Sequence, residues 1–368
     1  MSRNQRQDEI NGAFNLEQLG HEASEYLARN IDQLTHDIIR CQAKVQPDIQ
    51  ARYGSQGFDY YQRDIKFHLK FLRSALTYLS KGLFGSYIEW VKGLLIGLNI
   101  PVEDIAINFQ CFKQVFEAKA PSPVREILLE FMNAGLTLLD TDAVEIPSYL
   151  RDEFPLSELA TQYLEALLLG KSTKARQLIH DAIKSGVDVR DIYLQVLENV
   201  QLEVGRLWHS NQLTVAQEHY ITNLTRQIMN SLQSYIRPSE RVNRTIVASC
   251  VAGELHDLGI RMVSDFFELS GWDVYLTGAD TPLQAIIETI REQHADLLAI
   301  SVTIPWHVIE AEKLITKIRK DPLFKDMKII VGGRVFSLDP WLWKRVRADG
   351  YAPDARSAIE LAASLFKS

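Results

Sequence analysis

The sequence predicts a multidomain chain of α and α/β class, with two helical domains followed by a domain built on a parallel sheet. Two observations predict this class. From about residue 17 to residue 139, and again from residue 157 to residue 236, apolar residues recur three and four apart, which is the period of helices that bury one face. After residue 240, short β-branched runs alternate with helical segments, which is the pattern of βαβ units. We expect domains at 1–150, 151–238 and 239–368.

Composition favours a cytoplasmic globular protein. The 368 residues are 46% hydrophobic and 24% charged, and they suffice for two or three separate cores. We expect no membrane association, because no apolar run approaches the roughly 20 residues that span a bilayer. The N-terminus leads into no apolar signal core, so secretion is not expected. The widely spaced Cys41, Cys111 and Cys250 show no paired metal-ligand spacing and are expected to be reduced.

The net charge of −7 disfavours direct binding to nucleic acid, since the sequence shows neither a basic stripe nor a basic recognition helix. A self-contained catalytic site is not evident either. The chain has no nucleophilic triad, phosphate-binding loop or zinc-ligand cluster that the sequence reveals. We therefore leave enzymatic activity undecided and favour a binding or sensing function.

The first domain is predicted to be helical nearly throughout. The stretches 61–80 and 83–98 place apolar residues three and four apart, and Pro101 follows where a helix should stop or restart. The segment 141–155, with Pro147 and Pro155, is expected to be a linker.

The second domain, from Ser157 to Ile236, is predicted to form four helical pieces. Breaks fall at residues 170–172 and 186–188, and residues 210–212 precede the last piece. Short loops between such helices favour an antiparallel four-helix bundle. We expect residues 237–240 to end it.

The third domain is predicted to be a flavodoxin-like, or Rossmann-like, parallel sheet covered by helices. Apolar runs at 245–251, 273–276, 297–302 and 329–331 are each followed by a helical segment. Residues 349–351 are expected to add a short strand before a helix over 355–366. In this strand order the switch point, where ligands bind, lies at the end of the first strand.

A short motif stands at that point: Gly253-Glu254-Leu255-His256-Asp257-Leu258-Gly259. A histidine at the carboxyl end of a strand is well placed to meet a ligand. Glu254 could orient the His256 imidazole through its second nitrogen, as partners of metal-bound histidines do. Gly259 leaves room for a bulky group close to the backbone.

The motif resembles the E-x-H-x-x-G version of the cobalamin-binding signature, over about residues 243–367. The resemblance implies that His256 is the lower ligand of cobalt and that Glu254, Asp257 and Gly259 surround it. It also implies that residues at the ends of the third and fourth strands contact the nucleotide tail: Ser301, Thr303, Gly332 and Gly333. The alternatives are a hydrogen-bonded surface histidine and a glycine turn. A response-regulator receiver is disfavoured, because residues 301–305 contain no aspartate.

A second constellation lies in the bundle, where Trp208-His209 precedes Glu218-His219. Its spacing resembles the W-x9-E-H signature of cobalamin-dependent photoreceptors of the light-sensing repressor type. The resemblance implies that Trp208, Glu218 and His219 surround the adenosyl group of adenosylcobalamin, and that His209 ligates cobalt after photolysis. The alternative is that Trp208 packs in the bundle while Glu218 and His219 face solvent.

The resemblance favours a cobalamin-dependent photoreceptor, in which light breaks the Co–C bond and a domain or oligomer change signals to an unknown protein partner. A homo-oligomer is expected with it. The first alternative is a corrinoid carrier protein for methyl transfer, whose bundle would cap the cofactor with apolar residues. The second is a non-photochemical cobalamin sensor.

The N-terminal domain departs from the repressor pattern and looks like the photocobilins, which add a bilin chromophore. The resemblance implies a biliverdin or other bilin in an aromatic-rich helical pocket, with His68 at its polar edge. The alternative is that His68 and the surrounding aromatic residues pack the core of an interaction or dimerisation domain.

Overall fold

The computed structural model describes residues 3–142, 146–151, 153–236 and 240–367, with side chains from residue 15 onward except at 53 and 55–59. Its contacts divide the chain into two compact units, residues 1–144 and 145–368. The second unit contains both the predicted bundle and the predicted sheet domain. The division into three domains stays a prediction, and its predicted boundary at 237–239 lies outside the described residues.

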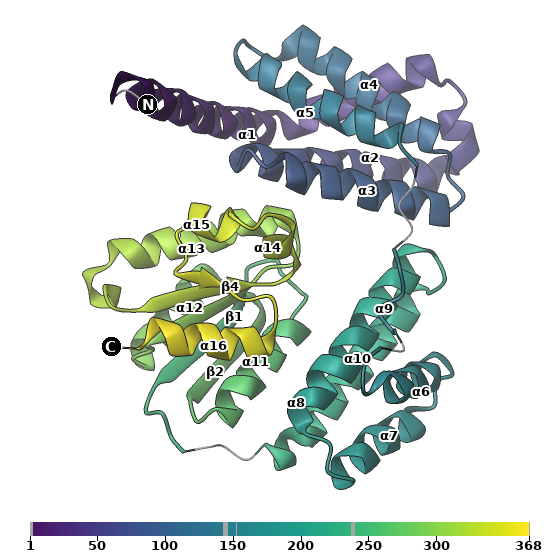
Figure 1. Ribbon diagram of the computed structural model, residues 1–368. Coiled ribbons are helices and arrows are strands. Elements are labelled where there is room, and N and C mark those ends of the chain that lie inside the picture. The colour runs from purple at the N-terminus through teal and green to yellow at the C-terminus, as the bar shows by residue number, and fades with distance from the viewer. Residues whose placement is uncertain (1–2, 143–145, 152, 237–239, 368) are drawn as a thin grey trace. The chain divides into compact units, whose positions relative to one another are not determined.

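The first unit is helical, as predicted, and Figure 1 shows its helices packed side by side. Ser80 begins a helix by accepting a hydrogen bond from the backbone of Leu83, and Pro101 stands just before the next helix, where the sequence predicts a stop. The helices are α1 (Arg3–Val45), α2 (Ile49–Thr77), α3 (Lys81–Gly97), α4 (Val102–Lys119) and α5 (Val124–Leu139).

His68 lies in the core of this unit. Its side chain is buried, its Nδ1 lies within hydrogen-bonding distance of the Tyr87 hydroxyl, and its ring packs edge-on against Phe109 and Phe112. Burial lowers the pKa of His68 to about 3. These contacts fit the core-packing alternative, since aromatic side chains of the same unit pack around the imidazole. The bilin and its contact with His68 stay predictions.

The bundle forms where the sequence predicts it. Its helices are α6 (Ser157–Leu168), α7 (Ser172–Lys184), a continuous helix over α8 (Val189–Asp191), η1 (Ile192–Glu198) and α9 (Asn199–His209), and α10 (Val215–Leu232). A capping box between Thr214 and Gln217 begins α10. The segment η1 is a π-helix, which the periodicity of the sequence does not reveal.

The remaining residues of the second unit form the predicted parallel sheet. Its strands are β1 (Thr245–Val251), β2 (Asp273–Thr281), β3 (Leu297–Ser301), β4 (Lys328–Gly332) and β5 (Gly350–Tyr351), in the order β2-β1-β3-β4-β5. All neighbouring strands are parallel. This is the flavodoxin-like order, so the switch point lies between β1 and β3, as predicted.

Helices cover both faces of the sheet (Figure 1). They are α11 (Leu258–Leu269), α12 (Leu283–Glu292), α13 (Val308–Lys320), α14 (Arg334–Leu338), α15 (Leu342–Arg345) and α16 (Ala355–Leu365). Short 3-10 turns lie at η3 (Pro305–His307) and η4 (Pro322–Phe324), and a third, η2 (Gln233–Tyr235), follows α10 of the bundle. Buried side chains of β1, β3 and β4 pack with those of α11 and α16 in one hydrophobic core. This core fixes the carboxyl edge of β1, from which the motif emerges.

The bundle and the sheet domain share a hydrophobic core within the second unit. Met262 and Phe266 of α11 pack among the buried residues of the bundle. A buried hydrogen bond of 2.7 Å from the Tyr193 hydroxyl to Asp265 lies in the same interface. The bundle is therefore packed against α11, the helix that follows the motif.

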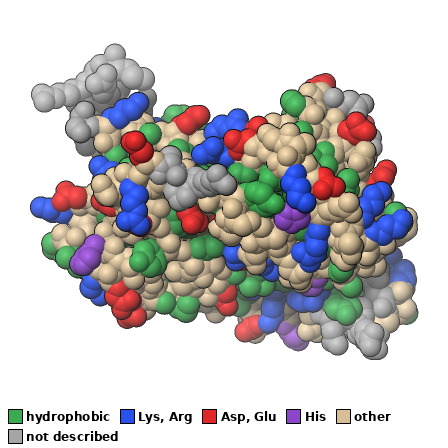
Figure 2. Space-filling model, turned by 90° about the horizontal axis from the view of Figure 1, so that it is seen from below, with side chains coloured by type: hydrophobic (Ala, Val, Ile, Leu, Met, Phe, Trp, Pro, Cys, Tyr) green, Lys and Arg blue, Asp and Glu red, His purple; other side chains and the backbone are tan. Residues whose placement is uncertain are grey.

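Charges of both signs are interspersed on the face shown in Figure 2, with hydrophobic side chains scattered among them. This distribution fits the expectation from the net charge of −7. Among the described residues, none of the helices has the length and apolarity required to cross a membrane.

Candidate functional site

The motif residues occupy the loop between β1 and α11. Gly253 takes a left-handed conformation with φ 82°, and its backbone N–H donates to Asp280 at 2.7 Å. The loop then places Glu254 inside the protein and His256 at its surface, since their side chains are 0% and 57% exposed. An exposed imidazole held by a buried carboxylate is the arrangement that the resemblance implies.

Glu254 is the centre of a hydrogen-bond network. Its Oε1 accepts from Nδ1 of His256 at 2.5 Å and from the His256 backbone at 3.1 Å. Its Oε2 accepts from the backbone N–H groups of Thr303 and Ile304, at 2.8 and 3.0 Å. Burial acts to raise the pKa of Glu254, but hydrogen bonds from His256, His307 and Ile304 outweigh it and hold this pKa well below its usual range.

The network leaves one nitrogen of His256 for a ligand. Because Nδ1 is bound to Glu254, the neutral imidazole presents Nε2 as its lone-pair donor. The hydrogen bond that His256 donates to Glu254 also raises the pKa of His256, which makes the imidazole more basic. The donor set therefore fits a metal that takes one neutral imidazole, such as the cobalt of a corrinoid.

His307 is a member of this network that the sequence analysis missed. Its Nδ1 lies 3.1 Å from Oε2 of Glu254, and its Nε2 accepts from Nε1 of Trp306 at 2.8 Å. Since the indole N–H can only donate, neutral His307 carries its proton on Nδ1 and donates it to Glu254. The carboxylate of Glu254 thus holds two histidines from different strand ends.

The glycines at the end of β4 have a backbone role. Gly333 has φ 91°, and a Cβ added there would lie 2.4 Å from the carbonyl oxygen of Val302. At Gly332 an added Cβ would lie 3.0 Å from the carbonyl oxygen of Ala352. The approach at Gly333 requires glycine whether or not a nucleotide tail lies nearby, and the approach at Gly332 leaves little room for a side chain. By contrast, an added Cβ at Gly259 meets no atom within 4 Å, so this side of α11 is open.

The structure also locates Ser301, Thr303 and Asp257, whose contacts with a cofactor stay predictions. Ser301 is buried at the end of β3, and Thr303 contributes its backbone N–H to Glu254. Asp257 is also buried, and its carboxylate accepts from Arg226 of α10 at 2.6 Å. Asp257 therefore joins the motif to the bundle.

The bundle residues lie on α9 and α10. Trp208 is partly buried against the bundle core, and His209 is 7% exposed. Glu218 accepts from Thr222 at 2.7 Å and lies 3.5 Å from His219, whose side chain is 69% exposed. The hydrogen bond from Arg226 to Asp257 shows that α10 passes close to the motif.

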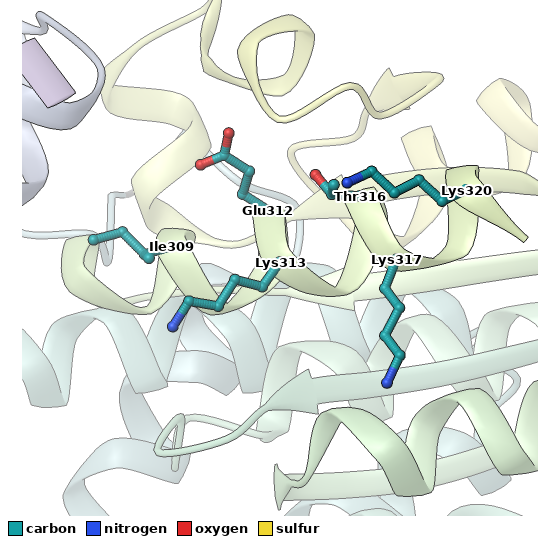
Figure 3. A pocket seen from close by; sticks show the side chains of 6 residues that line it. All are labelled: Ile309, Glu312, Lys313, Thr316, Lys317 and Lys320. Carbon is teal, nitrogen blue, oxygen red and sulfur yellow. The ribbon is translucent and has the colours of Figure 1, made fainter. Parts of the chain in front are cut away.

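Two hollows among the described residues of the second unit contain none of these residues. One of about 340 Å³ lies along α13 and is lined by Ile309, Glu312, Lys313, Thr316, Lys317 and Lys320. In Figure 3 these side chains spread from one helix, with Lys313 and Lys317 directed away from Glu312. This is an open charged surface, and the chemistry of the motif lies elsewhere.

Comparisons with known proteins identify both parts of the second unit. Residues 244–360 match a family described as a B12 binding domain, and residues 159–233 match a second family with the same description. The chain is 31% identical over 120 residues to a dimethylamine corrinoid protein of Methanosarcina barkeri, which is 33% of this chain and 55% of that protein. It is 30% identical over 127 residues to dimethylamine corrinoid protein 3 of Methanosarcina acetivorans, which is 34% of this chain and 59% of that protein. The chain thus spans a little over half the length of these relatives.

The fold also resembles a solved structure. The monomethylamine corrinoid protein of Methanosarcina barkeri is 20% identical, with a TM-score of 0.51, and the likeness covers 57% of this chain and all of that one. At this identity the likeness concerns the fold alone. It agrees with the observed order of a helical region followed by a parallel sheet.

The comparisons overturn the photoreceptor prediction. These relatives are corrinoid proteins named for dimethylamine, and neither their names nor the descriptions of the matched families refer to light sensing. The W-x9-E-H spacing misled the prediction, because a tryptophan and a Glu-His pair on adjacent bundle helices are compatible with any bundle that covers a corrinoid. The predictions that His209 ligates cobalt after photolysis and that the chain signals to a protein partner depended on the photoreceptor function, so they lose their basis. The chain carries B12-binding domains, and its relatives support a corrinoid cofactor.

Proposed function

We propose that the chain is a corrinoid carrier protein for methyl transfer, with a methyl group in place of the predicted adenosyl group. The observation that carries the proposal is the match of both the bundle and the sheet domain to B12-binding families, together with relatives named dimethylamine corrinoid proteins. When bound, the corrinoid would supply a cobalt that accepts and releases a methyl group.

In this proposal His256 ligates the lower face of cobalt. Glu254 keeps the Nδ1 proton of His256 in place, so that Nε2 remains available to the metal. Ionised Glu254 would also balance positive charge on the His256 imidazole when its Nε2 is bound to a metal. Glu254 is completely buried and fixed by the backbone of Thr303 and Ile304, which keeps this geometry rigid.

The polar pair on α10 is compatible with a methyl carrier. The sequence argument against that function was that Glu218 and His219 are unsuited to an apolar cap. Glu218, however, pairs with Thr222 and His219 of its own helix, and the His219 side chain is largely exposed. Both polar groups therefore have partners within α10 and require no adenosyl group.

The partner would be a methyltransferase that acts on a small methylated compound, with methylated amines suggested by the names of the relatives. The predicted homo-oligomer stays a prediction. The function of the N-terminal unit is not assigned by this proposal.

The test is methyl cycling on the full chain loaded with hydroxocobalamin and then reduced. It is incubated with a methyltransferase fraction from its native cells and, in turn, methylamine, dimethylamine, trimethylamine and methanol. We expect the absorption spectrum of the bound corrinoid to change with one of these donors and to return when a thiol acceptor is added. The His256→Ala variant should bind corrinoid with an altered spectrum. A chain that binds corrinoid but responds to none of the donors contradicts the proposal.

A further inference from the structure

Two arginines meet beside the motif, and each has a buried donor without a partner. Arg226 comes from α10 of the bundle and Arg261 from α11 of the sheet domain. Both contact Asp257: Arg226 lies 2.6 Å from Oδ1, and Arg261 lies 3.7 Å from Oδ2. Among the described residues, neither Nε has a hydrogen-bond partner, although both atoms are buried.

The rest of the Arg226 guanidinium is engaged, and Arg261 lies beside the same carboxylate. Arg226 also donates to Asn223 at 3.0 Å, so its Nη atoms are both used. A buried N–H without an acceptor costs free energy, and buried donors in proteins nearly always have a partner. Two such donors around one carboxylate therefore indicate that an acceptor is supplied from outside the chain.

The position of the pair identifies the class of acceptor. Asp257, which both arginines contact, directly follows His256 in the chain. The pair thus contacts the residue that follows the imidazole predicted to bind cobalt. The rim of a corrin carries acetamide and propionamide side chains, whose carbonyl oxygens are neutral acceptors.

We propose that Arg226 and Arg261 bind amide carbonyls on the rim of the corrin ring. Asp257 orients the two guanidiniums and neutralises part of their charge, which suits them to a neutral acceptor. Since Arg226 belongs to the bundle and Arg261 to the sheet domain, one ring held by both would bring the two parts together over the cofactor. The inference deepens the proposed carrier function, because both require corrinoid to bind.

The test compares arginine-to-lysine variants of the full chain, because lysine keeps the positive charge but has no Nε–H of this geometry. Hydroxocobalamin and cobinamide, which lacks the nucleotide and its phosphate, are titrated into each variant. We expect R226K and R261K each to weaken binding of both compounds by about tenfold. The matched control is R176K, since Arg176 is partly exposed and bonds to Gln227, the neighbour of Arg226 on α10. It should bind as the wild type does.

Any different result overturns the inference, and each one assigns another role to the arginine pair. Unchanged affinity in R226K and R261K removes the pair from the site. Weaker binding of hydroxocobalamin alone assigns the pair to the phosphate of the nucleotide tail. Protection of the wild-type apoprotein against thermal unfolding by inorganic phosphate, lost in both variants, assigns it to an anion. If the wild type binds neither corrinoid, the carrier proposal fails as well. Melting temperatures of the apoproteins verify that the variants fold.

Discussion

The buried carboxylate of Glu254 joins His307 to His256. It accepts from Nδ1 of His256 at 2.5 Å and lies 3.1 Å from Nδ1 of His307. Trp306 in turn donates to Nε2 of His307, which sets the tautomer of that ring. The orientation of the exposed imidazole thus depends on a side chain that is 51 positions further along the chain and follows a different strand.

This relationship predicts that His307→Ala weakens corrinoid binding. Loss of a hydrogen-bonding partner of a metal-ligand network commonly costs about 10–100-fold in affinity, because the ligand is no longer held in place. The His307→Asn variant should recover part of that loss, since its amide N–H can donate to Glu254. The measurement is the Kd for hydroxocobalamin together with the absorption spectrum of the complex. Equal binding by the wild type and His307→Ala would show that Glu254 needs no help from His307.

Glu254→Gln should destabilise the apoprotein and also weaken corrinoid binding. A neutral amide presents one acceptor oxygen and a donor NH₂ to groups that all donate, so at least one buried N–H loses its partner. The expected cost is about 1–3 kcal/mol in the free energy of unfolding. Urea unfolding of the apoprotein measures it. The control is Glu240→Gln, an exposed carboxylate outside the network, for which the free energy should stay within about 0.5 kcal/mol.

Two glycine substitutions should separate folding from cofactor binding. In Gly333→Ala the new Cβ meets the Val302 carbonyl, at a residue whose φ of 91° already disfavours side chains. We expect a loss of roughly 2–4 kcal/mol in the free energy of unfolding of the apoprotein.

Gly259→Ala should behave in the opposite way. Residue 259 lies in the first turn of α11 and faces open space, so alanine should leave the apoprotein as stable or stabilise it by up to about 1 kcal/mol. Corrinoid affinity should nevertheless fall, because the new methyl group occupies space beside His256. Unfolding curves of the apoproteins and corrinoid titrations check the pair. A stable Gly333→Ala, or full affinity in Gly259→Ala, would contradict this division.

Much of the fold could be predicted from the sequence because its signals are local. The β-branched runs of β1 and β3, the helix breaks near Gly170 and Gly186, and Pro101 before α4 each act within a few residues. The strand order then follows from the small number of ways to wind βαβ units. The position of His256 at the switch point therefore needed no long-range information.

The network behind His256 could not be predicted in the same way. His307 meets Glu254 only because β1 and β3 are neighbours in the sheet, and neither periodicity nor spacing records that contact. One signal was available: Trp306 and His307 follow the end of β3, at the edge where ligands of such sheets gather. Arg226 and Arg261 were missed for another reason, since arginines on amphipathic helices usually face solvent. The photoreceptor prediction from Trp208 and the Glu218-His219 pair was wrong, because these residue types suit more than one corrinoid chemistry.

The buried imidazole of His68 makes the stability of the N-terminal unit depend on pH. Burial lowers its pKa to about 3, against about 6.5 in the unfolded chain. Below pH 6.5 the unfolded chain binds a proton that the folded chain excludes, so this contribution is complete above pH 6.5 and is lost as pH falls toward 3. One such proton gives a slope of at most about 1.4 kcal/mol per pH unit.

The free energy of unfolding, measured by denaturant titration between pH 3 and pH 6.5, should therefore fall less steeply in His68→Gln than in the wild type. His21→Gln is the control, because His21 is exposed on α1 and should leave the slope unchanged. A His68→Gln slope equal to that of the wild type would mean that the imidazole is protonated within the fold, as a bound partner at its position would require.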